Sequence, residues 1–279
     1  MPGDDRPIGV FDSGMGGLTV LRALLARLPN ERFVYLGDTA RLPYGTKSPE
    51  TVQAYALQAT RLLVSEGVKM VVVACNTASA VALRPLTEAL SPVPVIGVIE
   101  PGARAGVATT RNNHIAVIAT EGTVKGAAYA RAIAALNGNI KVVQQPCQVF
   151  VALAEEGWTN SPATRAAAEH YLGPLFKNPS APDTLVLGCT HFPVLTETIR
   201  KVIGSKVALV DSAETTAIAV ADALASGRLG SMSVTNGGGA RIFATDSPER
   251  FARVGAVFLG RPIDAETVEL VDLRACKVT

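Results

Sequence analysis

The chain has 279 residues, of which 48% are hydrophobic and 18% charged, so it can form one large or two ordinary globular domains and is not intrinsically disordered. Its 26 basic and 24 acidic residues give a formal net charge of +2, and the absence of a basic block argues against a nucleic-acid partner. Apolar runs such as 68–75 are too short to span a bilayer, and residues 1–5 carry no signal-peptide pattern. We therefore expect a cytoplasmic protein with no membrane partner.

Apolar, β-branched runs alternate with amphipathic segments along the whole chain. In chain order, this pattern predicts strands at 8–11, 33–36, 70–74, 93–98, 115–119, 141–144, 184–187, 207–210, 240–244 and 267–270. Helical spacing predicts helices at 18–28, 50–66, 77–90, 124–136, 161–176, 194–202, 213–225 and 248–258. Such alternation is typical of α/β proteins, in which helices cover both faces of a parallel sheet.

The elements form two series, which predicts two doubly wound parallel-sheet domains facing each other across an active-site cleft. We expect residues 1–97 plus 211–279 in the first domain and 98–210 in the second. The two series share a local pattern, in which an apolar strand ends in a small residue that is followed by Cys75 or Cys189 and then by polar side chains. Because open α/β sheets bind ligands at the carboxyl ends of their strands, both cysteines are expected at the site, one from each domain.

Two further strand-to-helix junctions are rich in polar residues and glycines. In the segment 11–19, glycines allow backbone N–H groups to approach an anion at the start of the next helix. This segment lacks the Lys-Ser/Thr pair of a phosphate-binding loop, and Thr19 replaces the third glycine of a dinucleotide fingerprint. An ordinary turn explains this segment, and the segment 43–45, equally well.

The chain has four cysteines, namely Cys75, Cys147, Cys189 and Cys276. Their spacing supports neither a disulfide framework nor a zinc site, so no metal is expected. Cys147 and Cys276 lack polar neighbours in the sequence and are expected to be structural. Cys75 and Cys189 are either small core residues or reactive thiols. A thiol near a helix N-terminus has its thiolate favoured, which predicts a pKa below the ordinary value.

Two symmetrically placed thiols favour a reaction that inverts a carbon centre. One thiolate removes a proton from one face, and the other thiol delivers a proton to the opposite face. Asp12 beside Cys75, and His191 with Glu155 beside Cys189, are candidates for tuning the thiols. Each of these three residues also has a structural interpretation, because Asp12 and His191 can cap helices and Glu155 can lie at a solvated helix end.

Several segments together resemble the signature motifs of the glutamate racemases, within the aspartate/glutamate racemase family. The segments 12–17, 43–45, 75–77 and 188–193 occur in the same order and at similar spacing, and the segments 117–123 and 155–157 extend the resemblance over nearly the whole chain. The resemblance implies racemisation of glutamate without pyridoxal phosphate or another cofactor, D-glutamate supply for bacterial peptidoglycan, and a homodimer. It implies that Cys75 and Cys189 are the proton donor and acceptor, with Glu155 as a possible helper. The residues implied to contact the substrate or tune the thiols are Asp12, Ser13, Tyr44, Gly45, Asn76, Thr77, Thr190 and His191.

The chain departs from this family in the segment 147–155, where members usually carry a proline-rich stretch, so the alignment of Glu155 stays open. Three other functions also stay open. An aspartate or hydantoin racemase would use the same two thiols, although the motif at 188–193 favours glutamate. An amino-acid-binding protein would bind its ligand without catalysis. A hydrolase built on Cys189 and His191 would not need Cys75.

Overall fold

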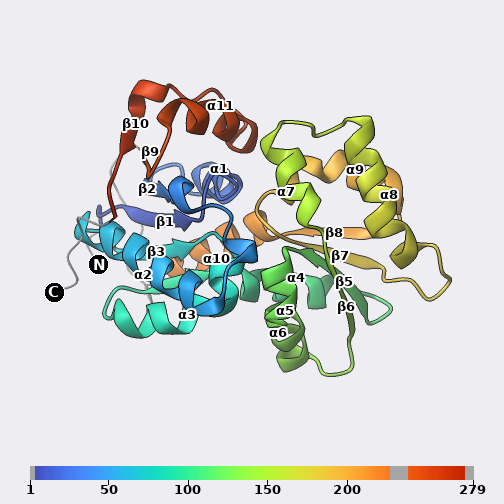
Figure 1. Ribbon diagram of the computed structural model, residues 1–279. Coiled ribbons are helices and arrows are strands. Elements are labelled where there is room, and N and C mark those ends of the chain that lie inside the picture. Colours follow the sequence, from blue (N-terminus) through green and yellow to red (C-terminus); the bar gives the residue numbers. More distant parts are fainter. Residues whose placement is uncertain (1–3, 227–237, 274–279) are drawn as a thin grey trace.

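The computed structural model describes residues 4–226 and 238–273, which contain two parallel sheets with helices around them (Figure 1). The strands of the first sheet are, in spatial order, β10 (Val268–Leu270), β9 (Gly239–Ala244), β2 (Arg32–Gly37), β1 (Ile8–Asp12), β3 (Met70–Val73) and β4 (Val95–Gly97). Those of the second are β6 (Lys141–Pro146), β5 (His114–Ala119), β7 (Thr184–Gly188) and β8 (Ala208–Asp211). This arrangement confirms the predicted α/β class with parallel sheets.

Helices pack against both sheets. Those that follow strands of the first sheet are α1 (Leu18–Arg27), α2 (Pro49–Ser65), α3 (Asn76–Ala89), α4 (Ile99–Thr109) and α11 (Pro248–Leu259). Those that follow strands of the second sheet are α5 (Glu121–Lys125), α6 (Ala128–Leu136), α7 (Gln148–Glu155), α8 (Pro162–Phe176), α9 (Thr196–Ile203) and α10 (Ser212–Ala225). Four 3-10 turns complete the described chain, namely η1 (Thr39–Arg41), η2 (Tyr44–Thr46), η3 (Phe192–Leu195) and η4 (Ala265–Thr267).

The central strands of the first sheet, β1 and β3, are covered on both faces. All five residues of β1 are buried. Successive side chains of a strand point to opposite faces, so Ile8 and Val10 belong to the core cluster that contains α1, whereas Phe11 belongs to the one that contains α2 and α3. The helices begin where the sequence supplies caps. Ser48 accepts a hydrogen bond from the backbone N–H of Thr51 at the start of α2, and proline follows directly at the first helical position.

The two sheets share a hydrophobic core. Helix α10 packs against α1 beside the first sheet and against α4, β7 and β8 of the second, and Figure 1 shows it between the two. After α10, the chain returns to the first sheet through β9 and β10. The carboxyl ends of β1, β3 and β7 are thereby brought close together, and these are the strands that precede the cysteine motifs and the glycine-rich turn. The domain boundaries near residues 98 and 211 stay a prediction.

Several elements differ from the sequence-based expectation. The helix expected at 124–136 is two helices, α5 and α6, because Ala127 has a left-handed backbone conformation with φ 47°. The helix expected at 194–202 begins as the 3-10 turn η3 and continues as α9. Helices α4 and α7 were not anticipated. In α4, Pro101 is the third helical residue, where the missing N–H removes no intrahelical hydrogen bond.

Among the helices of the described residues, none is both long and apolar enough to cross a bilayer.

Candidate active site

A small cavity of about 30 Å³ lies between the two sheets, at the carboxyl ends of their strands. Every residue that the sequence predicted for the site lines this cavity except Asp12 and Glu155, which lie behind it. The predicted residues that line it are Ser13, Tyr44, Gly45, Cys75, Asn76, Thr77, Cys189, Thr190 and His191. A cavity of this size holds roughly one or two water molecules. The structure therefore has a narrow site in which both cysteines face the same small space.

Cys75 follows β3 and is the N-cap residue of α3. Its Sγ accepts a hydrogen bond from the backbone N–H of Ala78 at 3.4 Å and lies 3.4 Å from Ser13 Oγ. These contacts favour the thiolate, but burial and the neighbouring Asp12 carboxylate outweigh them and raise the pKa of Cys75 to about 12. The expectation of a lowered pKa was therefore wrong for Cys75, because a helix N-terminus stabilises a thiolate less than complete burial destabilises it.

Asp12 ends β1 and supports the glycine-rich turn from beneath. Its Oδ2 accepts a hydrogen bond from the backbone N–H of Gly14 at 2.9 Å, whereas the N-cap of α1 is Gly17, so Asp12 does not cap that helix. Its Oδ1 is buried without a hydrogen-bond partner among the described residues. Burial raises the pKa of the Asp12 carboxyl, and the nearby His191 opposes this rise. Asp12 thus acts on Cys75 through its charge rather than by direct contact.

On the opposite side of the cavity, Cys189 begins a chain of polar contacts. Its Sγ lies 3.8 Å from His191 Nδ1, and His191 Nε2 lies 3.2 Å from Glu155 Oε1. The second carboxylate oxygen of Glu155 accepts a hydrogen bond from Arg250 at 3.0 Å. Burial lowers the pKa of His191, but the contacts with Cys189 and Glu155 outweigh it and raise that pKa to about 10. At neutral pH the imidazole therefore carries a positive charge beside the Cys189 sulfur.

Glycine at position 16 allows the two halves of the site to approach each other. A Cβ atom on Gly16 would overlap His191 Nδ1 and would lie 2.7 Å from Thr190 Oγ1. Thr19 Oγ1 also donates a hydrogen bond to the backbone oxygen of Thr190 at 3.0 Å. On its other side, the His191 ring packs edge-to-face on Phe258, with 5.0 Å between the ring centroids. The position of His191 thus depends on groups from both sheets.

Asn76 and Thr77 also make hydrogen bonds that join the two sheets. Asn76 Oδ1 accepts a hydrogen bond from the Tyr129 hydroxyl at 2.8 Å, while the Asn76 amide nitrogen is buried without a partner among the described residues. Thr77 Oγ1 lies 2.9 Å from Thr120 Oγ1, and Thr120 Oγ1 lies 3.0 Å from Thr123 Oγ1. The free amide N–H groups of Asn76 are donors available to a ligand in the cavity.

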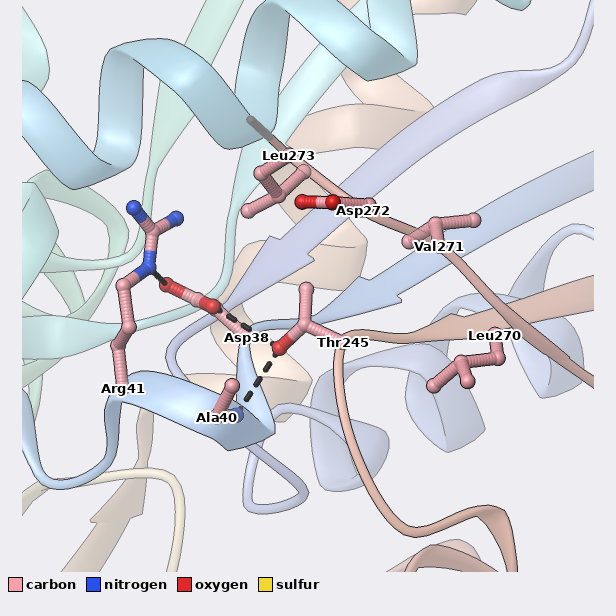
Figure 2. Close-up of a pocket in the computed structure, with 8 residues that line it drawn as sticks. All are labelled: Asp38, Ala40, Arg41, Thr245, Leu270, Val271, Asp272 and Leu273. Carbon is pink, nitrogen blue, oxygen red and sulfur yellow. Dashed lines mark hydrogen bonds and ion pairs between the residues drawn. The ribbon is translucent and has the colours of Figure 1, made fainter. Parts of the chain in front are cut away.

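Tyr44 connects the site to a larger cavity on its outer side. The Tyr44 hydroxyl donates a hydrogen bond to Asp38 Oδ2, which also pairs with Arg41 at 2.7 Å. Burial raises the pKa of Tyr44, and Asp38 raises it further, so the hydroxyl stays protonated. Figure 2 shows Asp38 and Arg41 in the wall of this outer cavity of about 610 Å³, together with Thr245. Neither thiol lines the outer cavity, so the smaller one is the candidate active site.

The remaining lining residues are Leu42, Pro43, Thr120, Gln148 and Val151. Pro43 and Thr120 lie in the segments 43–45 and 117–123, which resemble the family motifs, but neither was named as a site residue. Leu42, Gln148 and Val151 were missed as site residues. Gln148 directly follows Cys147 after β6, so the rule that ligands bind at the carboxyl ends of parallel strands, applied to β6, would have found it.

Cys147 is buried, does not line the cavity, and has its pKa raised by burial and by Cys189. Cys276 lies outside the described residues. Cys75, Cys147 and Cys189 are all free thiols.

Comparison with known proteins identifies the family. Residues 8–220 match the model of the Asp/Glu/hydantoin racemase family. A glutamate racemase of Geobacter metallireducens is 51% identical over 255 residues, which cover 91% of this chain and 93% of the relative. One from Syntrophus aciditrophicus is 49% identical, with 96% and 97% of the two chains covered. The crystal structure of glutamate racemase from Francisella tularensis in complex with D-glutamate has a TM-score of 0.89 and 38% identity, and the match covers 97% of this chain and 99% of that one. The chain therefore belongs to the Asp/Glu/hydantoin racemase family and, within it, to the glutamate racemases.

Proposed function

We propose that this isomerase interconverts L- and D-glutamate with two bases, Cys75 and Cys189, which act on opposite faces of the α-carbon. The observation that carries the proposal is that both buried thiols line one small cavity, each at the end of a strand from a different sheet. Inverting the α-carbon requires one proton to leave from one face and another to arrive on the other. A single base on one side of the cavity cannot do both.

The environments of the two thiols suit them to complementary tasks. The raised pKa of Cys75 keeps its proton on the sulfur at neutral pH, so that Cys75 is ready to donate. Cys189 is the proposed acceptor of the α-proton, and the His191 imidazole lies 3.8 Å from its sulfur. After the α-proton has moved to Cys189 and the Cys75 proton has moved to the carbon, the two thiols have exchanged protonation states. The reverse reaction then starts from the mirror-image configuration.

Negative charge that develops on the substrate must be stabilised by donors that are already in place. We propose that the buried Asn76 amide, together with the hydroxyls of Ser13, Thr77 and Thr190, supplies such donors. Tyr44 and Gly45 would contact the substrate from η2. Glu155 acts through His191, and Asp12 acts through the charge that it places near Cys75.

Substrate entry requires the cavity to widen. A space of about 30 Å³ is too small for glutamate, so the two sheets with their helices must move apart to admit it. Closing around the substrate would then exclude water and strengthen the electrostatic interactions within the site. A complex with glutamate bound in a wide-open, solvent-filled site would contradict this part of the proposal.

The family also suggests a cellular role. We propose that the chain supplies D-glutamate for peptidoglycan precursors in the cytoplasm and that it works as a homodimer. Expression in a bacterium that lacks its own glutamate racemase is expected to remove the requirement for added D-glutamate. Sedimentation of the purified protein at several concentrations tests the dimer.

The experiment that tests the mechanism is racemisation of L- and D-glutamate in heavy water without added cofactor. Wild type is expected to incorporate deuterium at the α-carbon, and Cys75→Ser and Cys189→Ser are each expected to lose racemisation. Cys147→Ala is the matched control, since it removes a buried thiol that does not line the cavity.

Each other outcome supports a different function. Binding of glutamate without deuterium exchange supports an amino-acid-binding protein. Racemisation retained in Cys75→Ser contradicts the two-thiol mechanism, and hydrolysis that persists in Cys75→Ser supports a hydrolase built on Cys189 and His191. Turnover of aspartate alone overturns the substrate assignment.

A further inference from the structure

A buried tyrosine outside the cavity makes a hydrogen bond to one residue of the site. Tyr129 lies in α6, which comes after β5 of the second sheet, whereas Asn76 is the first residue of α3 and comes after β3 of the first. The Tyr129 hydroxyl donates a hydrogen bond to Asn76 Oδ1 at 2.8 Å, and both side chains are buried. Asn76 lines the cavity and Tyr129 does not, so this hydrogen bond joins the site to the residues behind it.

The hydrogen bond determines which end of the Asn76 amide stays free. An amide oxygen only accepts hydrogen bonds, so Tyr129 supplies the proton. Burial raises the pKa of Tyr129, so its hydroxyl keeps that proton at neutral pH. With Oδ1 occupied, Nδ2 is the group that is left for the cavity.

The amide nitrogen of Asn76 differs from the other buried polar atoms that lack a partner. Among the described residues that line the cavity, it is the only such atom that donates hydrogen bonds. The side chain is only 2% exposed, so bulk water does not satisfy its N–H groups. A buried donor without a partner costs free energy, which indicates that a ligand in the cavity supplies the acceptor.

Close packing fixes the ring of Tyr129. The side chain is fully buried, and a Cβ atom on Gly188 would lie 2.9 Å from the ring, so glycine at this position makes room for the tyrosine. Gly188 ends β7 directly before Cys189, so the ring lies beside the strand that leads to the second thiol. A ring that is fixed in this way holds its hydroxyl at one point, and orienting an amide requires this.

Glutamate offers acceptors to the free amide nitrogen. Its oxygens belong to two carboxylates at neutral pH, and no lysine or arginine is among the described residues that line the cavity. Neutral N–H and O–H groups must therefore bind these oxygens. An amide turned the other way would present its own oxygen to the carboxylates, and acceptors that face each other repel.

We propose that Tyr129 is a positioning residue, whose hydroxyl fixes the Asn76 amide so that its nitrogen donates a hydrogen bond to a carboxylate of bound glutamate. Tyr129 acts through Asn76 and does not touch the substrate. The inference rests on the proposed function, because it requires glutamate to bind in this cavity. It goes beyond that function by naming the residue that sets the direction of the Asn76 amide.

A double-mutant cycle tests the proposal. Tyr129→Phe keeps the ring and removes only the hydroxyl, so the Asn76 amide is expected to lose its fixed orientation. We expect the Kd and KM for glutamate to rise about 10-fold. Asn76→Ala removes the amide, so adding Tyr129→Phe to that variant is expected to raise Kd and KM by less than about 2-fold further.

Asn76→Asp tests the direction of the amide. The carboxylate keeps an acceptor for Tyr129 but places a charged oxygen where the amide nitrogen was. Repulsion between this oxygen and the substrate carboxylate is expected to raise the Kd about 100-fold. The variant leaves Tyr129 in place, so this test does not depend on the folding of Tyr129→Phe.

Isothermal titration with an equal mixture of D- and L-glutamate measures Kd, because racemisation does not change the composition of that mixture. Steady-state assays in both directions measure KM and kcat. Partial unfolding lowers the apparent kcat but leaves KM and Kd unchanged, so a rise in Kd separates positioning from loss of folded protein. Tyr171→Phe is the matched control, because the Tyr171 hydroxyl lies 3.5 Å from the backbone nitrogen of Val149 and outside the cavity. It is expected to keep the wild-type Kd and KM.

Three results would overturn the inference and leave the proposed function standing. An unchanged Kd in Tyr129→Phe means that the hydroxyl does not position the amide. An equal rise in Kd with and without Asn76→Ala means that Tyr129 acts independently of Asn76. Equal or tighter binding by Asn76→Asp means that the amide oxygen, and not the nitrogen, faces the substrate. Wild type that binds no glutamate overturns the proposed function and this inference together.

Discussion

Glu155 and His191 form a part-buried ion pair behind Cys189, with 3.2 Å between Glu155 Oε1 and His191 Nε2. An ionised carboxylate can only accept hydrogen bonds, so Nε2 carries the proton in this contact. The raised pKa of His191 places a second proton on Nδ1 at neutral pH, and this nitrogen faces the Cys189 sulfur. The carboxylate at the end of α7 thus supports the charge on the imidazole beside the thiol, although it does not line the cavity.

Replacing Glu155 by Gln is expected to slow racemisation. The neutral amide no longer adds to the raised pKa of His191, so the imidazolium beside the Cys189 sulfur is less favoured. Losing a charge-assisted hydrogen bond of this kind is expected to decrease kcat by about 10- to 100-fold. Steady-state assays in both directions measure the effect. Glu156→Gln, an exposed neighbour in the sequence, is the control and should behave as wild type. Equal kcat values for Glu155→Gln and Glu156→Gln would contradict the role of the pair.

The same pair is expected to make stability depend on pH. The folded-state pKa of His191 is raised from 6.5 to about 10. Its contribution to the free energy of unfolding is therefore complete below pH 6.5 and is lost as the pH rises toward about 10. The pKa of Glu155 is lowered from 4.5, although burial acts in the opposite direction, because His191 and Arg250 stabilise the carboxylate. Its contribution is complete above pH 4.5 and is lost as the pH falls through the folded-state pKa.

The pair should therefore stabilise the protein most between about pH 4.5 and 6.5. Urea unfolding of wild type and Glu155→Gln at several pH values measures the difference in the free energy of unfolding. We expect a difference of about 1–3 kcal/mol within that window and a smaller one near pH 10. A difference that stays constant from pH 5 to pH 10 would show that the two groups do not titrate as a pair.

Adding a methyl group at Gly16 is expected to disturb His191. The Cβ of Gly16→Ala would overlap the imidazole, which cannot move away freely because Phe258 and Glu155 contact it on other sides. Overpacking of this kind costs about 1–3 kcal/mol of stability. We expect slower racemisation in both directions and a lower midpoint of thermal unfolding, and both are measured on the same samples. Gly239→Ala is the control, because a Cβ there meets no atom within 4 Å. Wild-type kcat in Gly16→Ala would mean that the position of His191 does not matter for catalysis.

Removing the charge of Asp12 is expected to lower the pKa of Cys75. Burial is the larger cause of the raised pKa, and the Asp12 carboxylate is the next. Asp12→Asn keeps an oxygen that can accept the hydrogen bond from the Gly14 backbone but removes the negative charge that opposes a thiolate. Cys75 should then be alkylated by iodoacetamide at lower pH than in wild type. Mass spectrometry of the Cys75 peptide measures the rate, and the Cys147 peptide in the same samples is the internal control. Identical pH profiles for Cys75 would exclude an electrostatic influence of Asp12.

The sequence by itself determined the features that depend on local pattern. The apolar runs before Cys75 and Cys189 are strands because each is buried on both faces, and the polar residues after each cysteine follow from the way a parallel strand ends. The glycine-rich turn after Asp12 was equally visible. These features predicted the α/β class and most of the residues that line the cavity. Short helices that follow no strong periodicity, such as α7, were not visible in this way.

Only the tertiary structure decided how these local features act together. Helix α7 follows β6, yet its packing against η3 brings Gln148 into the cavity and Glu155 against His191, residues far apart in the sequence. The Cys75 thiol shows the same dependence. Its place at a helix N-terminus can be read locally and predicts a low pKa, whereas its burial and its proximity to Asp12 arise only when the sheets pack together, and they raise that pKa to about 12. Burial and charge proximity depend on the whole fold, so a local sequence pattern does not contain them.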